Sequence, residues 1–219
     1  MTLQVDVFWS FRSPYSYLAT TRIAEIAARY DVEMRIRPVY PLAVRVDGFF
    51  DRQDPRWLMY LGRDCYRTAQ MLGMTFGPPR PDPIVMNLAT REIPREQPYI
   101  RRLTHLGQAA CEAGRGIPFI CEVARIIWDG QTDGWDQGDH LARATARAGL
   151  DLPTLEAVVA AEGDRLEAEV QASHAALDAA GHWGVPTFVF EGEPFFGQDR
   201  IDVLLWRLRQ HGLTEKPAA

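Results

Sequence analysis

The sequence feature that most constrains the fold is a hydrophobic period that changes twice along the chain. Apolar and polar residues alternate in segments 3–9 and 32–37, a period of two that is typical of β-strands. From about residue 48 to residue 181 the apolar residues recur at helical spacing instead, and alternation returns only in 187–196. The β-rich ends can share one mixed sheet only if the helical segment between them is an insertion.

The first forty residues predict a strand, a helix and a second strand. Four apolar residues share one face of the first strand: Leu3, Val5, Val7 and Trp9. Phe8 lies on the other face. Ser13 and Pro14 then open a helical stretch, and the second strand stops at Pro38. Two strands joined by one crossover helix run parallel, so this pair is predicted to be parallel.

The remaining segments are punctuated by glycine and proline. Gly114, Gly130 and Gly149 stand just after helical runs and predict helix ends. The proline-rich segment 77–83 predicts a loop. A hairpin over 187–196 is predicted for the tail. The predicted helices are 58–72, 98–113, 118–129, 139–148, 153–162, 164–180 and 199–210.

Charge and hydropathy narrow the kind of partner. The 219 residues include 24 Lys and Arg and 29 Asp and Glu, which gives a net charge of −5 at pH 7. This acidic balance argues against binding to nucleic acid or to a membrane surface. No apolar run approaches the roughly 18 residues of a membrane span, and no signal-like segment opens the sequence. We therefore expect a cytoplasmic protein whose partner is a small molecule.

Cysteines and histidines give no support for a redox pair or a metal site. Cys65, Cys111 and Cys121 are odd in number, and no two are separated by only two residues, which argues against a disulfide framework and a dithiol pair. We expect them in the core. The five histidines are scattered without metal-ligand spacing, so no metal is expected.

Segment 13–16, with sequence SPYS, stands where a strand gives way to a helix. Serine at the N-cap followed by proline is a favourable start for any helix, and this alone explains the segment. The alternative is functional. Unpaired N–H groups and the positive end of the helix dipole meet at such a point, so a bound anion, such as a thiolate, would be stabilised beside the Ser13 hydroxyl.

Segment 184–187, with sequence GVPT, places Pro186 at the start of a strand. Alone it is a plain strand-entry proline. Within the predicted order of elements, however, it stands where a thioredoxin-like fold places a cis-proline against the N-terminus of the first helix. We therefore predict an α/β fold, with a thioredoxin-like domain from residues 1–47 and 182–219 and a large all-helical insertion over 48–181.

Three separated motifs carry a resemblance to a known family: 13–19 (SPYSYLA), 184–187 (GVPT) and 196–200 (FGQDR). In this order they resemble the 2-hydroxychromene-2-carboxylate isomerase family, relatives of the kappa-class glutathione transferases, and the resemblance runs over nearly the whole chain. In fold the chain also resembles bacterial disulfide-forming oxidoreductases, which carry cysteines at the positions of Ser13 and Ser16. Two serines there exclude dithiol–disulfide exchange.

The resemblance implies glutathione as the cofactor and assigns residues to it. Ser13 would donate a hydrogen bond to the glutathione sulfur and, with the helix N-terminus, lower the pKa of the thiol. The backbone of Val185, just before Pro186, would pair with the cysteinyl part. Gln198 and Asp199 would face the γ-glutamyl end. Capping of the last helix is the alternative role for Asp199.

The resemblance also implies a reaction, a substrate and an assembly. The reaction is an isomerisation of 2-hydroxychromene-2-carboxylate or a related aromatic-pathway carboxylate through reversible thiolate addition. Asn87 matches a family position near the substrate, and the assembly would be a homodimer. Two alternatives stay open: a kappa-type glutathione transferase that conjugates an electrophile, and a non-catalytic thioredoxin-like binding module.

The sequence departs from the family pattern near the predicted site. Ser10 stands where many members carry an acidic residue, Arg12 adds positive charge beside Ser13, and segment 45–55 lacks an Asn- and Lys-containing pattern associated with substrate contact. These departures leave a different electrophile open as the substrate. The isolated large aromatic residues could form the walls of an aromatic pocket, but we expect them in the core: Trp57, Phe119, Trp128, Trp135 and Trp183.

Overall fold

The alternating segments at the two ends of the chain form one mixed sheet in the computed structural model, which describes residues 2–87 and 89–217. The strands are β1 (Leu3–Trp9), β2 (Val32–Pro38), β3 (Thr187–Phe190) and β4 (Glu193–Phe196). Their order in the sheet is β2–β1–β3–β4. β2 runs parallel to β1, whereas β3 is antiparallel to both β1 and β4. The predicted mixed sheet and its parallel first pair are confirmed.

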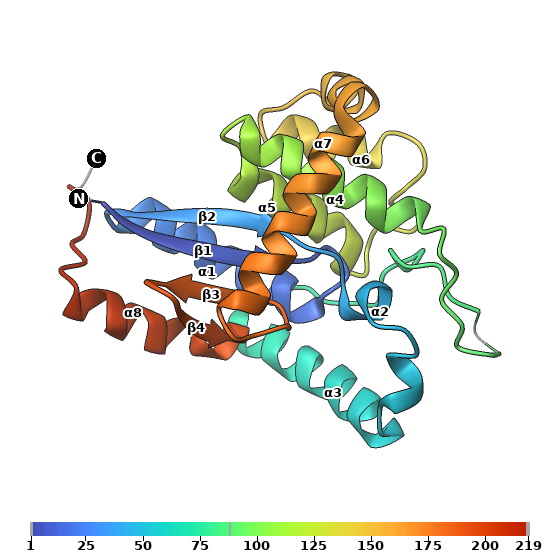
Figure 1. Cartoon of the computed structure of the whole chain (residues 1–219), viewed down its shortest axis with the longest axis horizontal. Helices are drawn as coiled ribbons and strands as arrows, with labels where there is room; N and C mark the ends of the chain where they lie inside the picture. The colour runs from blue at the N-terminus through green and yellow to red at the C-terminus, as the bar shows by residue number, and fades with distance from the viewer. Residues whose placement is uncertain (1, 88, 218–219) are drawn as a thin grey trace.

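Alternation within β1 decides which helix covers which face of the sheet. Val7 and its neighbours on the same face are buried in the main core together with apolar residues of α1 (Pro14–Arg29). Phe8 points to the opposite face, where it packs with Leu177 of α7 (Leu152–Ala179). Figure 1 accordingly shows α7 crossing the sheet on one side and α1 lying behind it.

The segment between β2 and β3 is helical, as its period predicts. Its helices are α2 (Leu42–Arg45), the 3-10 helix η1 (Phe50–Arg52), α3 (Pro55–Leu72), α4 (Pro98–Glu112), α5 (Gly116–Trp128), α6 (His140–Arg147) and α7. α4, α5 and α7 all contact β2, and α5 packs along α1. The boundaries of the inserted domain stay a prediction.

Three details differ from the predicted elements. The helices predicted over 153–162 and 164–180 are one helix, α7, with a kink at Glu162 (φ −126°, ψ 22°) in place of a break. The short helices α2 and η1 have no counterpart in the prediction. The last predicted helix is divided into the 3-10 helix η2 (Gln198–Arg200) and α8 (Ile201–Gln210).

Three of the long helices begin in the same way, with a capping side chain and a proline at the first or second helical position. Ser13, Asp54 and Asp151 each accept a hydrogen bond from a backbone N–H two or three residues further on.

Within residues 2–87 and 89–217, no helix is both long and apolar enough to cross a membrane. The same residues contain no group of three or more His, Cys, Asp or Glu side chains arranged to hold a metal ion.

Candidate functional site

Ser13 lies between β1 and α1 and joins two distant parts of the chain. Its Oγ accepts a hydrogen bond from the Ser16 N–H (3.2 Å) and so caps α1. The same hydroxyl donates to the Val185 carbonyl oxygen (3.2 Å), 172 residues away in sequence. The first turn of α1 contains no acidic residue. The N–H groups and the helix dipole at this end therefore favour a bound anion.

The loop that carries Val185 is fixed by its neighbours. The Val185–Pro186 bond is cis, as expected for this position in a thioredoxin-like fold. The Pro186 carbonyl accepts a hydrogen bond from the Gly197 N–H (2.9 Å). A Cβ on Gly184 would lie 2.6 Å from Cε2 of Phe196, so only glycine fits here without a shift of the ring. Ser13, the Pro186 loop and the turn after β4 thus form one continuous region.

Gln198 and Asp199 follow directly after Gly197, which places them beside the Pro186 loop. Gln198 is 7% exposed, whereas Asp199 is exposed and its carboxylate lies 3.2 Å from the Arg200 guanidinium. The N-cap of α8 is Arg200, so the structure does not give Asp199 the alternative capping role. The carboxylate of Asp199 is exposed to solvent, and its ion pair with Arg200 lies at the surface.

Asn87 lies in a different part of the surface, between the proline-rich loop and α4. Its side chain is exposed, and Oδ1 accepts hydrogen bonds from the N–H groups of Ala89 (2.9 Å) and Thr90 (3.2 Å). The amide therefore shapes its own turn. Among residues 2–87 and 89–217 no hydrogen bond joins Asn87 to the Ser13 region, and its role toward a substrate stays a prediction.

Arg12 ties the proline-rich loop to the region of Ser13. Its guanidinium donates to both carboxylate oxygens of Asp82, with Nε–Oδ1 at 3.2 Å and Nη2–Oδ2 at 3.0 Å. Asp82 also accepts from the Ile84 N–H (3.0 Å). The Arg12 guanidinium lies 5.9 Å from the centroid of the Phe50 ring. Because Asp82 neutralises Arg12, the positive potential at Ser13 comes chiefly from the helix N-terminus.

Tyr15, in the first turn of α1, joins this region to α3. Its hydroxyl donates to Oδ2 of Asp64 (2.6 Å), and Asp64 is paired with Arg67 (3.0 Å). Burial, and then the hydrogen bond to Asp64, raise the pKa of Tyr15 far above its usual value. The phenol therefore stays protonated at neutral pH and brings no negative charge to the start of α1.

None of the three cysteines supplies a reactive thiolate. Cys65, Cys111 and Cys121 lie on α3, α4 and α5 and pack in or against the main core, as predicted. Burial raises the pKa of each thiol to about 12. A thiol with such a pKa is protonated at neutral pH and a poor nucleophile. Sulfur chemistry at Ser13 would therefore need a thiol from outside the chain.

Two of the five large aromatic residues are not in the core, contrary to the sequence prediction. Phe119, Trp128 and Trp135 are buried. Trp57 is 38% exposed and Trp183 is 60% exposed. The Trp183 ring stacks on His182 (4.7 Å between centroids), which stacks on Phe196 (4.1 Å). Burial is predicted from the periodic spacing of apolar residues, and an isolated aromatic residue gives no such pattern. The only sequence signal that Trp183 lies near the site is its position next to the GVPT motif.

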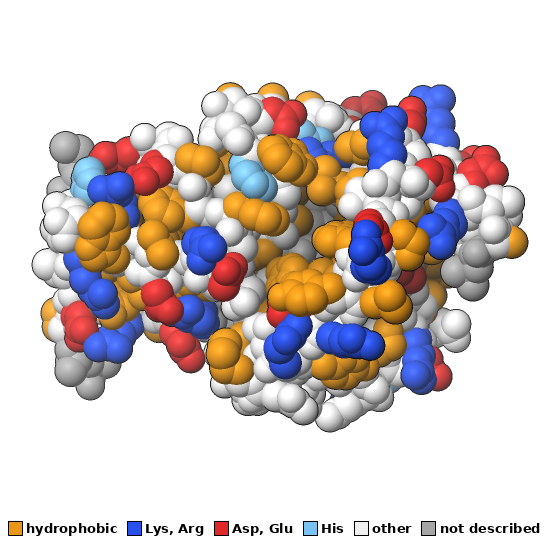
Figure 2. Space-filling model, turned by 90° about the horizontal axis from the view of Figure 1, so that it is seen from below, with side chains coloured by type: hydrophobic (Ala, Val, Ile, Leu, Met, Phe, Trp, Pro, Cys, Tyr) orange, Lys and Arg blue, Asp and Glu red, His pale blue; other side chains and the backbone are white. Residues whose placement is uncertain are grey.

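The face of the molecule below the sheet, which carries α3 and α8, is hollowed near its middle. Figure 2 shows hydrophobic side chains gathered around this hollow, with Lys and Arg side chains close to its rim. Hydrophobic walls and a few charged groups are typical of sites for small organic molecules. The first turn of α1 is joined to this face through the hydrogen bond from Tyr15 to Asp64 of α3.

Comparisons with known proteins agree with the thioredoxin-like fold. The family described as DSBA-like thioredoxin domain matches residues 4–209. A 2-hydroxychromene-2-carboxylate isomerase from Pseudomonas putida is 25% identical over 206 residues, which cover 91% of each chain.

Solved structures share the fold. A 2-hydroxychromene-2-carboxylate isomerase structure superposes with a TM-score of 0.67 at 24% identity, covering 95% of this chain and 96% of that one. The cytosolic disulfide reductase DsbM from Pseudomonas aeruginosa, solved with GSH, superposes with a TM-score of 0.57 at 20% identity, covering 94% of this chain and 100% of that one.

Proposed function

Because the chain belongs to the DSBA-like thioredoxin domain family, we propose that it binds glutathione at Ser13 and isomerises 2-hydroxychromene-2-carboxylate or a related aromatic-pathway carboxylate. One observation carries this proposal: the Ser13 hydroxyl caps α1 and donates to the carbonyl just before Pro186. The relative named as an isomerase supports the reaction. The disulfide reductase solved with GSH supports the tripeptide as ligand.

The hydrogen bonds at Ser13 fit a thiol ligand that arrives with its own backbone. The Ser13 O–H donates to the Val185 carbonyl, and Oγ accepts from the Ser16 N–H. A cysteinyl N–H can take the place of the hydroxyl at the Val185 carbonyl, as in strand addition. The Ser13 O–H is then free to turn toward the sulfur. One hydrogen bond is exchanged for two, while the cap of α1 is kept.

The charges around Ser13 favour the ionised form of a bound thiol. The helix N-terminus is positive, Tyr15 stays protonated, and Asp82 is engaged with Arg12. Cysteines at helix starts have pKa values of roughly 3.5–7.5 for this reason. When bound at Ser13 and the N–H groups that open α1, glutathione would supply a thiolate for reversible addition to the conjugated carboxylate substrate and would not be consumed.

The other predicted residues complete the same proposal. The Val185 backbone pairs with the cysteinyl part, and Gln198 with Asp199 receives the γ-glutamyl end, where the exposed Asp199 carboxylate suits an α-ammonium group. Asn87 contributes to substrate binding, a role that rests on the family resemblance alone. The assembly is a homodimer, as the family resemblance implies.

Glutathione binding is the first test of the proposal. Calorimetric titration of the full chain with millimolar glutathione is expected to show binding, and the ultraviolet absorbance of bound thiolate is expected to report a lowered thiol pKa. Ser13→Ala should raise that pKa, since the variant retains the helix dipole but loses the hydroxyl donor. No heat of binding at millimolar glutathione would leave only the non-catalytic binding module.

The fate of glutathione separates the isomerase from the kappa-type transferase. An isomerase returns the tripeptide after each turnover, whereas a transferase releases it as an adduct. With 2-hydroxychromene-2-carboxylate as substrate, a free-thiol assay is expected to give a constant glutathione concentration while product accumulates. Stoichiometric loss of free thiol would support the transferase instead.

A further inference from the structure

A half-buried arginine beside the Pro186 loop lacks a carboxylate partner. Arg45 ends α2, and its Nη2 donates to the Trp183 carbonyl oxygen. Its Nε is buried without a hydrogen-bond partner, and among residues 2–87 and 89–217 its guanidinium forms no ion pair. Buried charges in proteins are normally paired, because an unpaired one loses its hydration without compensation. Arg45 is therefore a cation in need of an anion.

Arg45 lines a cavity of about 460 Å³ between α2, α4 and α7. Small-molecule sites typically measure roughly 300–1,000 Å³. Apolar and aromatic groups form much of the cavity wall: Tyr40, Leu42, Val44, Val46 and Trp183. A second cation, Arg101 of α4, lines it as well. Trp183 connects the cavity wall with the Pro186 loop, since it stands two residues before Val185 in the sequence.

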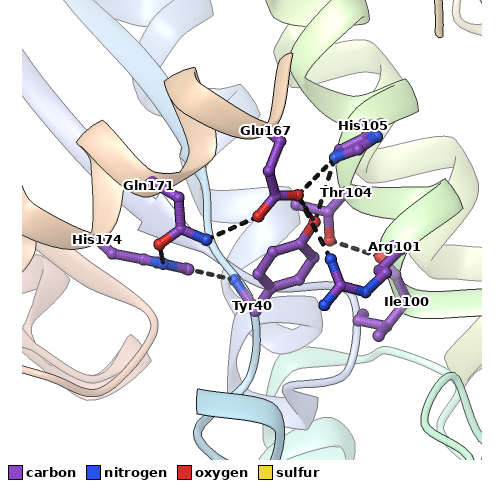
Figure 3. A network of polar contacts seen from close by, with 8 residues as sticks. All are labelled: Tyr40, Ile100, Arg101, Thr104, His105, Glu167, Gln171 and His174. Atoms are coloured by element: carbon purple, nitrogen blue, oxygen red, sulfur yellow. Dashed lines mark hydrogen bonds and ion pairs between the residues drawn. The ribbon is translucent and has the colours of Figure 1, made fainter. Parts of the chain in front are cut away.

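The half-buried carboxylate of this cavity, Glu167 of α7, already has its partners (Figure 3). Its Oε2 accepts a hydrogen bond from the Tyr40 hydroxyl (2.5 Å) and lies 2.9 Å from Nε2 of His105. Nη1 of Arg101 is 3.7 Å from the same oxygen, and Oε1 accepts from Nε2 of Gln171 (2.7 Å). Glu167 thus leaves the charge of Arg45 uncompensated.

The two other titratable groups around the cavity also leave Arg45 unpaired. His174 is held between the Tyr40 N–H, which donates to Nε2 (2.9 Å), and Gln171 Oε1, 3.2 Å from Nδ1. Burial and the charge of Arg45 lower the pKa of His174 to about 4, so the ring is neutral at pH 7. Asp178 is exposed and attracts Arg45 without a direct contact.

We propose that this cavity binds the carboxylate of the second substrate, an aromatic acid, with Arg45 as its principal partner and Arg101 as an auxiliary one. The Arg45 guanidinium lines the cavity and gives the carboxylate a charge-assisted hydrogen bond, and the rings of Trp183 and Tyr40 flank the aromatic ring. That the bound acid is the substrate rests on the proposed function. The preference of the cavity for a carboxylate can be tested without knowing the substrate.

Salicylate and salicylamide are suitable probes, since they share an aromatic ring and differ in the charge of one group. Calorimetric titration of the full chain at pH 7 is expected to give a Kd for salicylate at least about 10-fold lower than for salicylamide. Arg45→Gln should raise the salicylate Kd at least about 10-fold, and Arg101→Gln should raise it less. Arg209→Gln, an exposed arginine on α8, should leave it unchanged.

Glutathione titrated into the same proteins distinguishes this inference from the proposed function. Arg45→Gln is expected to bind glutathione as the wild type does. If Arg45→Gln loses affinity for glutathione and binds salicylate unchanged, Arg45 belongs to the tripeptide site and the inference is overturned. Equal affinities of the wild type for salicylate and salicylamide would also overturn it. A third result is also informative: the wild type binds no glutathione, but it binds salicylate and Arg45→Gln weakens that binding. This result would support the carboxylate site and contradict the proposed function.

Discussion

At the scale of single residues, Ser13 carries two roles that mutation can separate. Its Oγ caps α1 through the Ser16 N–H, and its O–H donates toward the Pro186 loop. Ser13→Ala removes both. We expect a loss of about 1 kcal/mol in the free energy of unfolding, typical of a lost N-cap, and a fall in turnover on the order of 10²-fold, typical of a lost oxyanion donor.

A second capping residue provides the matched control. Asp151 caps α7 by accepting from the Thr154 N–H, and nothing places it near Ser13. Asp151→Ala should lower stability in urea unfolding without changing turnover with glutathione. If Ser13→Ala loses stability and keeps the turnover of the wild type, the hydroxyl has no part in the chemistry.

His174 gives the fold a dependence on pH. The pKa of this buried histidine is lowered to about 4 by burial and by the charge of Arg45, whereas in an unfolded chain it is about 6.5. Above pH 6.5 the ring is neutral in both states and has no effect. As the pH falls from 6.5 toward 4, only the unfolded state gains the proton, so the free energy of unfolding falls by about 1 kcal/mol per pH unit.

The comparison that isolates this effect is His174→Gln, whose amide can still accept the Tyr40 N–H. Urea unfolding of both proteins between pH 4.5 and 7.5 is expected to show a steeper loss of stability in the wild type below pH 6.5. Carboxylates such as Glu167 act equally in the two proteins, because burial and its hydrogen bonds shape its pKa in both. Parallel curves would mean that His174 takes up its proton at the same pH in the folded and unfolded states, so that its pKa is not lowered by the fold.

At the scale of elements, local patterns were enough for most of the secondary structure. Alternation in β1, the serine cap at Ser13 and the strand-entry Pro186 each depend on a few neighbouring residues, and all three are as predicted. Gly163, between the predicted helices 153–162 and 164–180, marks a helix end by its sequence, yet α7 continues through it with a kink at Glu162. Local sequence signals thus predict where helices and strands lie better than they predict whether a helix is interrupted.

The parts of the site that sequence did not reveal depend on residues far apart in the chain. The contacts of Tyr40 with Glu167 and His105 span 127 and 65 residues. Arg45 is significant only because its guanidinium is half buried beside Trp183. Neither burial of one polar side chain nor exposure of one tryptophan leaves a periodic signal, so both need the tertiary structure.

The junction between the proline-rich loop and the end of α5 requires glycine. A Cβ on Gly77 would lie 2.6 Å from Cα of Gly130, and the Gly77 N–H donates to the Trp128 carbonyl (2.8 Å). Since backbone meets backbone here, no side chain can move aside. Gly77→Ala is expected to lower the free energy of unfolding by about 2 kcal/mol, and to weaken substrate turnover, because this loop leads to Asp82 and its pairing with Arg12.

Gly62, inside α3, is the matched control for this substitution. A Cβ there meets no atom within 4 Å. Gly62→Ala should therefore raise the free energy of unfolding by about 0.5–1 kcal/mol, the usual gain in a helix interior. If the two substitutions change the free energy of unfolding equally, the backbone around Gly77 and Gly130 can move apart at no cost to accommodate a Cβ.

At the scale of the whole molecule, the helical insertion and the sheet share their core. The Trp128 ring N–H of α5 donates to the Phe11 carbonyl just after β1 (2.8 Å), and Phe11 contacts the Phe119 ring edge-on (6.1 Å). A Cβ on Gly107 of α4 would lie 2.8 Å from Cε2 of Phe11. The segment that leads into Ser13 is thus held by two helices of the insertion.

This shared core predicts that the chain unfolds as one unit. Separation of the insertion would expose Phe11, Phe119 and the indole of Trp128 to water together, and burying a large side chain contributes about 1.5–3 kcal/mol. Native-state hydrogen exchange in low urea should give the amides of β1 and those of α5 the same free energy of opening. A lower value confined to α4, α5 and α7 would show that the insertion unfolds independently, and that Ser13 is positioned by the sheet alone.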